Sequence, residues 1–258
     1  MLETRGIRQV IGGKTILDGI DADFTPGMFH VIVGPNGSGK STFLKVFSGE
    51  TRPTAGTVQY DGKDIFALDR KDLARIRAVM SQNPELHFPL RVYDIVMMGR
   101  YPHFGIVHSK HDEAIVAKSM EAAGVGSFAE RDYLTLSGGE QQRVQFARAL
   151  AQIWEPVDGY GRFLFLDEAV SHLDLKYQHQ VLGLARDLTR QQVTVIAILH
   201  DLNHALTYGD RILFMKNGRV AHDIPGGHAL DASMIHEVFD VEARVVDSGI
   251  QGRRVVIF

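Results

Sequence analysis

The chain contains no cysteine, so it can form neither a disulfide framework nor a metal site built from thiolates. It also has no apolar run close to the roughly 18 residues that a membrane-spanning helix needs. Residues 1–5 lack the apolar segment of a secretion signal. Any role at a membrane would therefore depend on a partner that itself spans the bilayer.

A strong charge of either sign is absent as well. Against 31 acidic residues the chain has 28 lysines and arginines, which gives a net charge of −3. This balance offers no basic surface of the kind that nucleic-acid binding requires. With 258 residues, of which 45% are hydrophobic, the chain can bury a large core, either as one domain or as two lobes.

The segment from Gly34 to Thr42 carries the most informative motif, a glycine, four residues and then Gly-Lys-Ser. It follows the apolar run 28–33, typical of a buried strand, and leads into 42–47, which is typical of a helix. Glycines allow the backbone to aim N–H groups at phosphate oxygens beside the helix N-terminus. The predicted triphosphate site comprises Gly34, Pro35, Asn36, Gly37, Ser38, Gly39, Lys40, Ser41 and Thr42. Lys40 would reach the β- and γ-phosphates, and Ser41 would be a ligand of Mg²⁺.

A second glycine-rich helix start occurs at Ser137, Gly138, Gly139 and Glu140. Ser137 followed by Glu140 three residues later is a capping-box pattern, so we expect a helix to begin here. The two glycines would expose N–H groups at its N-terminus and give a second anion-binding site. Taken alone, the same pattern also fits an ordinary capped helix.

The remaining pattern indicates an α/β protein. Alternating segments before residue 33 predict an antiparallel β portion, and later strands that alternate with helices predict a mainly parallel sheet. Helical periodicity dominates from about 88 to 158, with helices expected at 92–99, 110–124 and 138–153. We therefore expect a P-loop NTPase core of the RecA-like type in residues 1–87 and 159–258, with residues 88–158 as a helical lobe inserted into it.

Together the two glycine-rich segments make the chain resemble the ATP-binding-cassette (ABC) ATPases, whose signature is Leu-Ser-Gly-Gly-Gln/Glu. The resemblance covers nearly the whole chain, and the family's motifs occur in the family's order. It implies a homodimer in which each ATP is held between the P-loop of one chain and the signature of the other, in contact with Ser137 and Gly139. Cofactors implied in this way are ATP and Mg²⁺.

The resemblance also assigns roles at the ends of strands. Asp167 ends an apolar run and would hold Mg²⁺, commonly through water. Glu168 is the next residue; strand alternation would turn it away from Asp167, and it would act as general base toward water. His200 would be the switch histidine at the γ-phosphate, and Gln82 would sense Mg²⁺ and the attacking water. Ser171–Asp174 matches the segment where family members meet across the dimer.

Three positions depart from the family's pattern. Ala169 and Val170 stand where Pro-Thr usually follows the glutamate, and His172 replaces a residue that is more often small. At Ile11 the family usually has an aromatic side chain that stacks on adenine. Base binding should therefore be looser, and selectivity for ATP over GTP lower.

Residues 96–103 resemble a block found in ATPases for iron-siderophore, haem and vitamin B12 import, and the stretch 147–163 most resembles the haem importers. The resemblance thus implies an ATPase powering bacterial haem uptake. It would act on the cytoplasmic face of the inner membrane, with permease subunits and, indirectly, a periplasmic binding protein. Siderophore or cobalamin import remains open. A soluble ABC ATPase acting on nucleic acid or ribosomes is less favoured, because the chain lacks the coiled-coil arm, zinc cysteines or second cassette usual in that class. A P-loop kinase would leave the signature and Glu168 without a role.

The permease is expected to dock on residues 83–105, and a charge swap at Arg100 would test that docking role. Apolar residues of the same stretch would equally fit the core of the helical lobe; they are Phe88, Leu90, Val92 and Tyr93. Histidines nearby invite a haem-ligand interpretation, but their spacing fits no metal motif and we expect them to be exposed polar groups. They are His87, His103, His108 and His111.

Overall fold

The protein, a computed structural model, has a four-stranded antiparallel sheet at its N-terminus with the order β2-β1-β4-β5. Its strands alternate buried and exposed side chains, as expected for a sheet with one face against a core. Both β1 and β2 are longer than the sequence predicted. The bounds are β1 Leu2–Ile11, β2 Lys14–Phe24, β4 Ala55–Tyr60 and β5 Lys63–Asp64. The structure describes residues 1–81, 89–171, 173–226, 229–249 and 254–258.

A second sheet has six strands in the order β10-β9-β3-β8-β7-β6, and every neighbouring pair except β10 and β9 is parallel. Its bounds are β3 Phe29–Val33, β6 Arg77–Met80, β7 Arg162–Asp167, β8 Val193–Ile198, β9 Arg211–Lys216 and β10 Arg219–Pro225. The strands β3, β7 and β8 are buried along their whole length, which accounts for their continuous apolar runs. The predicted α/β class, with a mainly parallel sheet and an antiparallel N-terminal portion, is confirmed.

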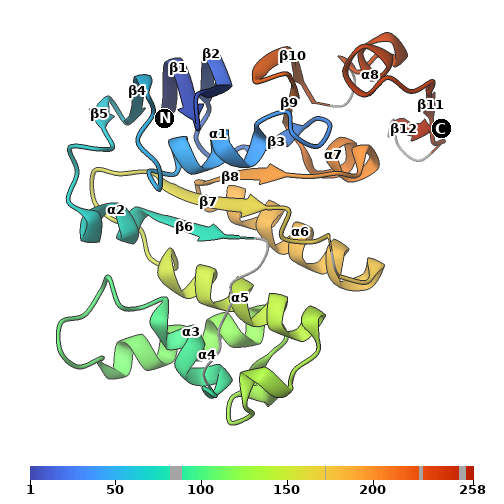
Figure 1. The fold of residues 1–258 in the computed structure, drawn as a ribbon. Helices are drawn as coiled ribbons and strands as arrows, with labels where there is room; N and C mark the ends of the chain where they lie inside the picture. The colour runs from blue at the N-terminus through green and yellow to red at the C-terminus, as the bar shows by residue number, and fades with distance from the viewer. Residues whose placement is uncertain (82–88, 172, 227–228, 250–253) are drawn as a thin grey trace.

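Helices cover both faces of this six-stranded sheet. They are α1 Lys40–Phe47, α2 Arg70–Ile76, α5 Gly138–Gln152, α6 Leu175–Thr189 and α7 Leu202–Tyr208. Alternate side chains of one strand enter two separate apolar clusters: Phe165 packs with Phe43 of α1, whereas Leu166 packs in the cluster that holds Phe146 of α5. The sheet therefore stands between α1 and α5, as Figure 1 shows.

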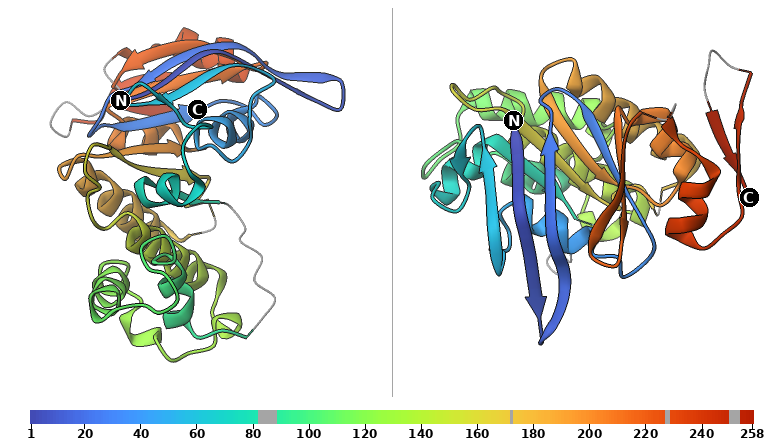
Figure 2. Two further views of the ribbon diagram at one scale, coloured as in Figure 1. Left: turned by 90° about the vertical axis from the view of Figure 1, so that its left-hand side faces the viewer. Right: turned by 90° about the horizontal axis from the view of Figure 1, so that it is seen from above.

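Three helices, α3 Val92–Met98, α4 Lys110–Ala122 and α5, pack together at one end of the molecule. Figure 2 shows α3 and α4 at the end of the molecule away from the two sheets, with α5 between them and the six-stranded sheet. Two short 3-10 helices, η1 Gly126–Phe128 and η2 Tyr133–Thr135, connect α4 to α5. A capping box formed by Ser109 and Asp112 begins α4. The three helices lie where periodicity predicted them, with ends that differ by one or two residues.

The C-terminal part consists of α8 Ala232–Phe239 and a hairpin of β11 Arg244–Asp247 with β12 Arg254–Ile257. The hairpin is attached to α7, because the Asn203 side chain donates to Val256 O at 3.2 Å and accepts from Val256 N at 2.8 Å. Across the ranges given above, none of the helices has both the length and the apolar character needed to cross a membrane.

Candidate functional site

The turn between β3 and α1 is fixed by backbone contacts. A Cβ atom at Gly34 would lie 2.2 Å from Met215 O, so only glycine fits there. Gly39 is the N-cap of α1 with φ 99°, a left-handed conformation that favours glycine. Since α1 has no side-chain cap, the N–H groups of its first turn remain available to an anion.

Beside this turn lies a hollow of about 350 Å³. It is lined by Lys14, Ile16, Asn36, Gly37, Gly39, Lys40, Ser41, Thr42 and Glu168. Lys40 is buried, and its Nζ donates to Gly34 O at 2.9 Å and Pro35 O at 3.1 Å. Burial lowers the pKa of Lys40, and the carboxylates of Glu168 and Asp167 oppose that shift. The hydroxyl of Ser38 is buried, with no hydrogen-bond partner in the described part of the chain.

Sequence reasoning missed Lys14 and Ile16, which line the end of the hollow formed by the β1–β2 hairpin. The signal that could have found them is the turn at Gly12 and Gly13, where both glycines have positive φ. That turn reverses the chain and brings Lys14 opposite Ile11 in the antiparallel register.

Ser41 and Asp167 come together from different elements. The Ser41 hydroxyl donates to Asp167 Oδ1 at 3.0 Å, joining the start of α1 to the end of β7. A hydroxyl and a carboxylate are the donors that suit Mg²⁺, which takes few protein ligands and completes its shell with phosphates and water. Burial raises the pKa of Asp167, and the hydrogen bond from Ser41 opposes this. The described residues contain no group of three or more histidines and carboxylates placed to hold a metal.

Glu168 and His200 are in polar contact, with His200 Nε2 at 2.8 Å from Glu168 Oε2. The prediction that strand alternation orients Glu168 was wrong, because β7 ends at Asp167 and Glu168 has φ 53°. The left-handed conformation is supported by Ser171, whose hydroxyl donates to Glu168 O at 2.8 Å. Gln82 and His172 lie outside the described residues.

The second glycine-rich segment begins α5 as predicted. Ser137 and Glu140 form the full capping box, in which Ser137 N donates to Glu140 Oε2 at 2.8 Å. These bonds from Ser137 lower the pKa of Glu140. Ser137 and Gly138 are exposed, and neither they nor Gly139 and Glu140 line the hollow beside α1.

Sequence comparison gives a consistent result. A model of the family described as "ABC transporter" matches residues 17–171. The hemin import ATP-binding protein HmuV of Gloeobacter violaceus is 44% identical, over 85% of this chain and 80% of the relative. The protein of the same name from Mesorhizobium japonicum is 42% identical, over 95% of this chain and 93% of the relative.

Solved structures show the same fold. A dimeric bacterial ABC transporter cassette superposes with a TM-score of 0.76 at 27% identity, covering 87% of this chain and 98% of the cassette. A protein described as a metal-chelate type ABC transporter, in an inward-facing conformation, superposes with a TM-score of 0.82 over 100% of this chain and 97% of that chain. At 23% identity the second likeness concerns the fold alone.

Proposed function

Because the chain belongs to the ABC transporter family, as an ATPase cassette, we propose that it hydrolyses ATP to power haem uptake through a membrane permease. One observation supports this most: the residues at the start of α5, from Ser137 to Glu140, do not line the hollow beside the start of α1. The six-stranded sheet lies between the two helices (Figure 1), and Ser137 and Gly138 are exposed. Each chain thus carries one half of each of two nucleotide sites.

A homodimer with twofold symmetry completes both sites, because the P-loop of one protomer then meets the signature of its partner. In this arrangement Ser137 and the N–H groups of Gly138 and Gly139 contact the γ-phosphate of ATP bound to the other protomer. Glu140 acts indirectly, since its carboxylate accepts from Ser137 N and orients the segment.

Within each nucleotide site, the proposed role of each residue follows from its place in the fold. Mg²⁺ would be held by Ser41 and Asp167, with Gln82 as a further proposed ligand, and would offset charge on the β- and γ-phosphates. Glu168 accepts a proton from the water that attacks the γ-phosphate, which contributes about 10²–10⁴-fold to the rate. His200 Nε2 lies 2.8 Å from Glu168 Oε2, although His200 does not line the hollow beside α1. We propose that it contacts the same phosphate once nucleotide is bound.

Haem is the proposed cargo because the relatives at 40–44% identity carry the name of hemin import ATP-binding proteins. The cargo itself would pass through the permease. We place the chain on the cytoplasmic face of the bacterial inner membrane, and a periplasmic binding protein would act only through the permease. Transport assays in vesicles with haem, a ferric siderophore and cobalamin test this choice; uptake of either alternative without haem would contradict it.

We keep residues 88–158 as the proposed signature lobe and its loop 101–108 as part of the docking surface. That loop exposes Tyr101 at 57%, Ile106 at 101% and Val107 at 74%, which suits an apolar segment of the permease. One expectation for this region changes: Arg100 is 2% exposed and so belongs to the interior. Val92 is fully buried in the lobe's core, which is the alternative left open for it.

Of the nearby histidines expected to be exposed, His111 is exposed as predicted, whereas His103 and His108 are half-buried. Each has a polar partner: Glu155 for His111, Gln152 O for His103 and Glu113 for His108. His87 lies outside the described residues, like Phe88.

The substitution Glu168→Gln tests the dimer mechanism. Removing the general base should leave ATP binding intact and trap an ATP-bound dimer with very slow turnover. Light scattering with ATP and Mg²⁺ measures the mass. A variant that stayed monomeric at high protein concentration would contradict the proposal, and Glu113→Gln, far from the hollow, serves as control.

A further inference from the structure

We propose that Arg100 and Glu155 act as a positioning clamp between the exposed loop 101–108 and the C-terminal end of α5. Through these contacts, a force that the permease applies to the loop would be transmitted along α5 to the signature segment at its N-terminal end. The inference rests on the proposed function, since it concerns how the ATPase responds to its permease.

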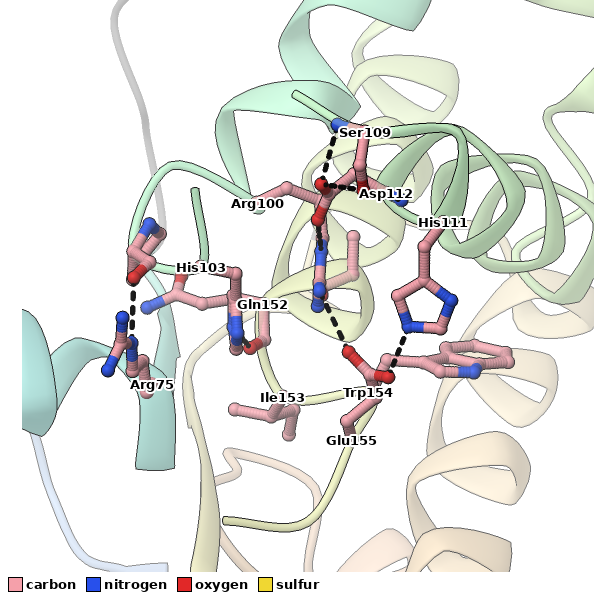
Figure 3. Close-up of polar contacts among 12 residues, drawn as sticks. Arg75, Arg100, His103, Ser109, His111, Asp112, Gln152, Ile153, Trp154 and Glu155 are labelled. Carbon is pink, nitrogen blue, oxygen red and sulfur yellow. Dashed lines mark hydrogen bonds and ion pairs between the residues drawn. The ribbon is translucent and has the colours of Figure 1, made fainter. Parts of the chain in front are cut away.

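Arg100 uses every nitrogen of its guanidinium group (Figure 3). Its Nε donates to Asp112 Oδ1 at 2.9 Å, Nη1 donates to Ala151 O at 3.0 Å, and Nη2 donates to Glu155 Oε2 at 2.8 Å. At 2% exposure the group is shielded from water. A planar guanidinium with three fixed acceptors restricts orientation more than a lysine ammonium would.

The end of α5 is held by side chains from two directions. Its last residues have no left-handed glycine to terminate them, since the C-cap Ile153 has φ −110°. Instead Arg100 bonds Ala151 O, His103 Nε2 lies 2.7 Å from Gln152 O, and Arg162 Nη1 donates to Ile153 O at 3.0 Å. Arg162 belongs to β7, the strand that ends at Asp167. The C-terminal end of α5 is thus bonded both to the segment at loop 101–108 and to β7, the strand that ends at Asp167.

Loop 101–108 is fastened along its backbone and presents its apolar side chains outward. Arg75 Nε donates to Pro102 O at 2.8 Å, and Lys71 Nζ donates to Phe104 O at 3.3 Å, so α2 of the core holds it as well. Tyr101, Ile106 and Val107 remain exposed. A partner segment pressing on these side chains would therefore push on a loop that has little freedom to yield locally.

Other charged groups around the clamp complete the network. The Asp112 carboxylate also accepts from Ser109 N at 2.9 Å and Ser109 Oγ at 2.7 Å. His111 Nε2 lies 2.5 Å from Glu155 Oε1. Because the side chain of Glu155 is 36% exposed, a substitution at Glu155 should disturb the fold less than a substitution at Arg100.

The first experiment compares Glu155→Gln with Glu113→Gln in the complete transporter. Glu113 is an exposed carboxylate on α4 that lies 3.2 Å from His108 Nε2, so it is a matched control outside the Arg100 network. We expect Glu155→Gln to leave ATPase activity of the isolated chain within about twofold and to lower haem transported per ATP at least about fivefold. The control should retain both values.

An unchanged transport ratio in Glu155→Gln would overturn the inference, as would a parallel loss of isolated ATPase activity and thermal stability. Failure of the proposed function looks different, because then the wild-type complex itself would not transport haem.

A second experiment needs no permease. Since the chain has no cysteine, Val107→Cys on the loop and Thr57→Cys on β4, both exposed, give one clean pair of spin labels. The distance distribution between them should broaden when Arg100→Gln is added and stay narrow with Glu113→Gln. Equal widths for both variants would overturn the clamp, and near-ultraviolet circular dichroism confirms that the Arg100→Gln chain is folded.

Discussion

The N-termini of α1 and α5 resemble each other in sequence and differ in construction. Both are rich in glycine, yet the turn before α1 is locked against the sheet, where a Cβ at Gly34 would meet Met215 O at 2.2 Å. At Gly138 a Cβ would meet nothing within 4 Å. The start of α1 has no side-chain cap and adjoins a hollow. The start of α5 is capped by Ser137 and Glu140, and its Ser137 and Gly138 are exposed.

This difference indicates that the two helix N-termini have different functions. The N-terminus of α1 is shaped by contacts within its own chain, so we expect it to bind phosphate in the absence of a partner. The second keeps a stable helix start in water by satisfying its own N–H groups, and it would gain an anion only from another surface. Arg100 and Arg162 hold the C-terminal end of α5. A movement of the helical lobe would therefore also move the signature residues at the N-terminal end of the same helix.

The largest expected effect comes from mixing two defective variants, Lys40→Ala in the P-loop and Ser137→Arg in the signature. Each alone should lose at least about 100-fold in ATPase activity, because each removes electrostatic stabilisation of the transferred phosphoryl group. In an equal mixture, heterodimers contain one intact composite site, so roughly a quarter of wild-type activity should return. Steady-state phosphate release measures this. A mixture no more active than the two variants alone would count against sites shared between chains.

A smaller effect separates the two glycines. Gly34→Ala should lower the free energy of unfolding by about 1–3 kcal/mol, because the new methyl group overlaps a backbone carbonyl that must move. Gly138→Ala should be nearly neutral for stability, since its surroundings are open. Urea denaturation of the two variants provides the comparison. Equal losses would mean that both ends are equally constrained, contrary to the difference described above.

Carboxylates at the two ends should respond to pH in opposite ways. Burial raises the pKa of Asp167 above its ordinary 3.8, so its contribution to stability is present below that value and is lost as pH rises through the raised pKa. Asp167→Asn should therefore be more stable than wild type near neutral pH, and the gain should vanish in acid.

Glu140 behaves in the reverse sense. Hydrogen bonds from Ser137 lower its pKa from 4.5, so it stabilises the fold above that value and this is lost as pH falls through the lowered pKa. Glu140→Gln should be less stable than wild type near neutral pH, with the difference closing in acid. Thermal unfolding of both variants from pH 3 to pH 8 checks the signs, and two curves of the same slope would refute this contrast.

Sequence reasoning succeeded where local patterns decide the structure. The P-loop turn, the capping box at Ser137 and the buried run of β7 all depend on residues close together in the chain, and all are present. The parallel sheet followed from the alternation of strands and helices. These features needed no knowledge of distant contacts.

It failed where distant contacts decide. Arg100 reads as a surface residue because arginine is rarely buried, but Asp112 and Glu155 pair with it inside the lobe. The sequence predicts that Glu168 continues the strand after Asp167. Glu168 instead has a left-handed backbone conformation, so strand alternation does not set its orientation. Lys14 and Ile16 gave no signal of their own, since only the packing of the hairpin beside α1 brings them to the hollow.

The smallest expected effect tests whether the P-loop end acts without a partner. Ile11 is 54% exposed and pairs with Lys14, which lines the hollow beside α1. We expect the base of a nucleotide bound in the hollow to lie near this hairpin. An aromatic ring there could stack on the base, so Ile11→Tyr should tighten ATP binding by about 3- to 10-fold. The gain should appear in calorimetric titration of the isolated Ser137→Arg chain, whose signature is defective, since the base contacts only its own protomer. Wild type should bind ATP and GTP within about threefold of each other, because aliphatic contacts do not distinguish purine edges. If Ile11→Leu tightened binding as much as Ile11→Tyr, or if wild type preferred ATP strongly, stacking would not be what this position lacks.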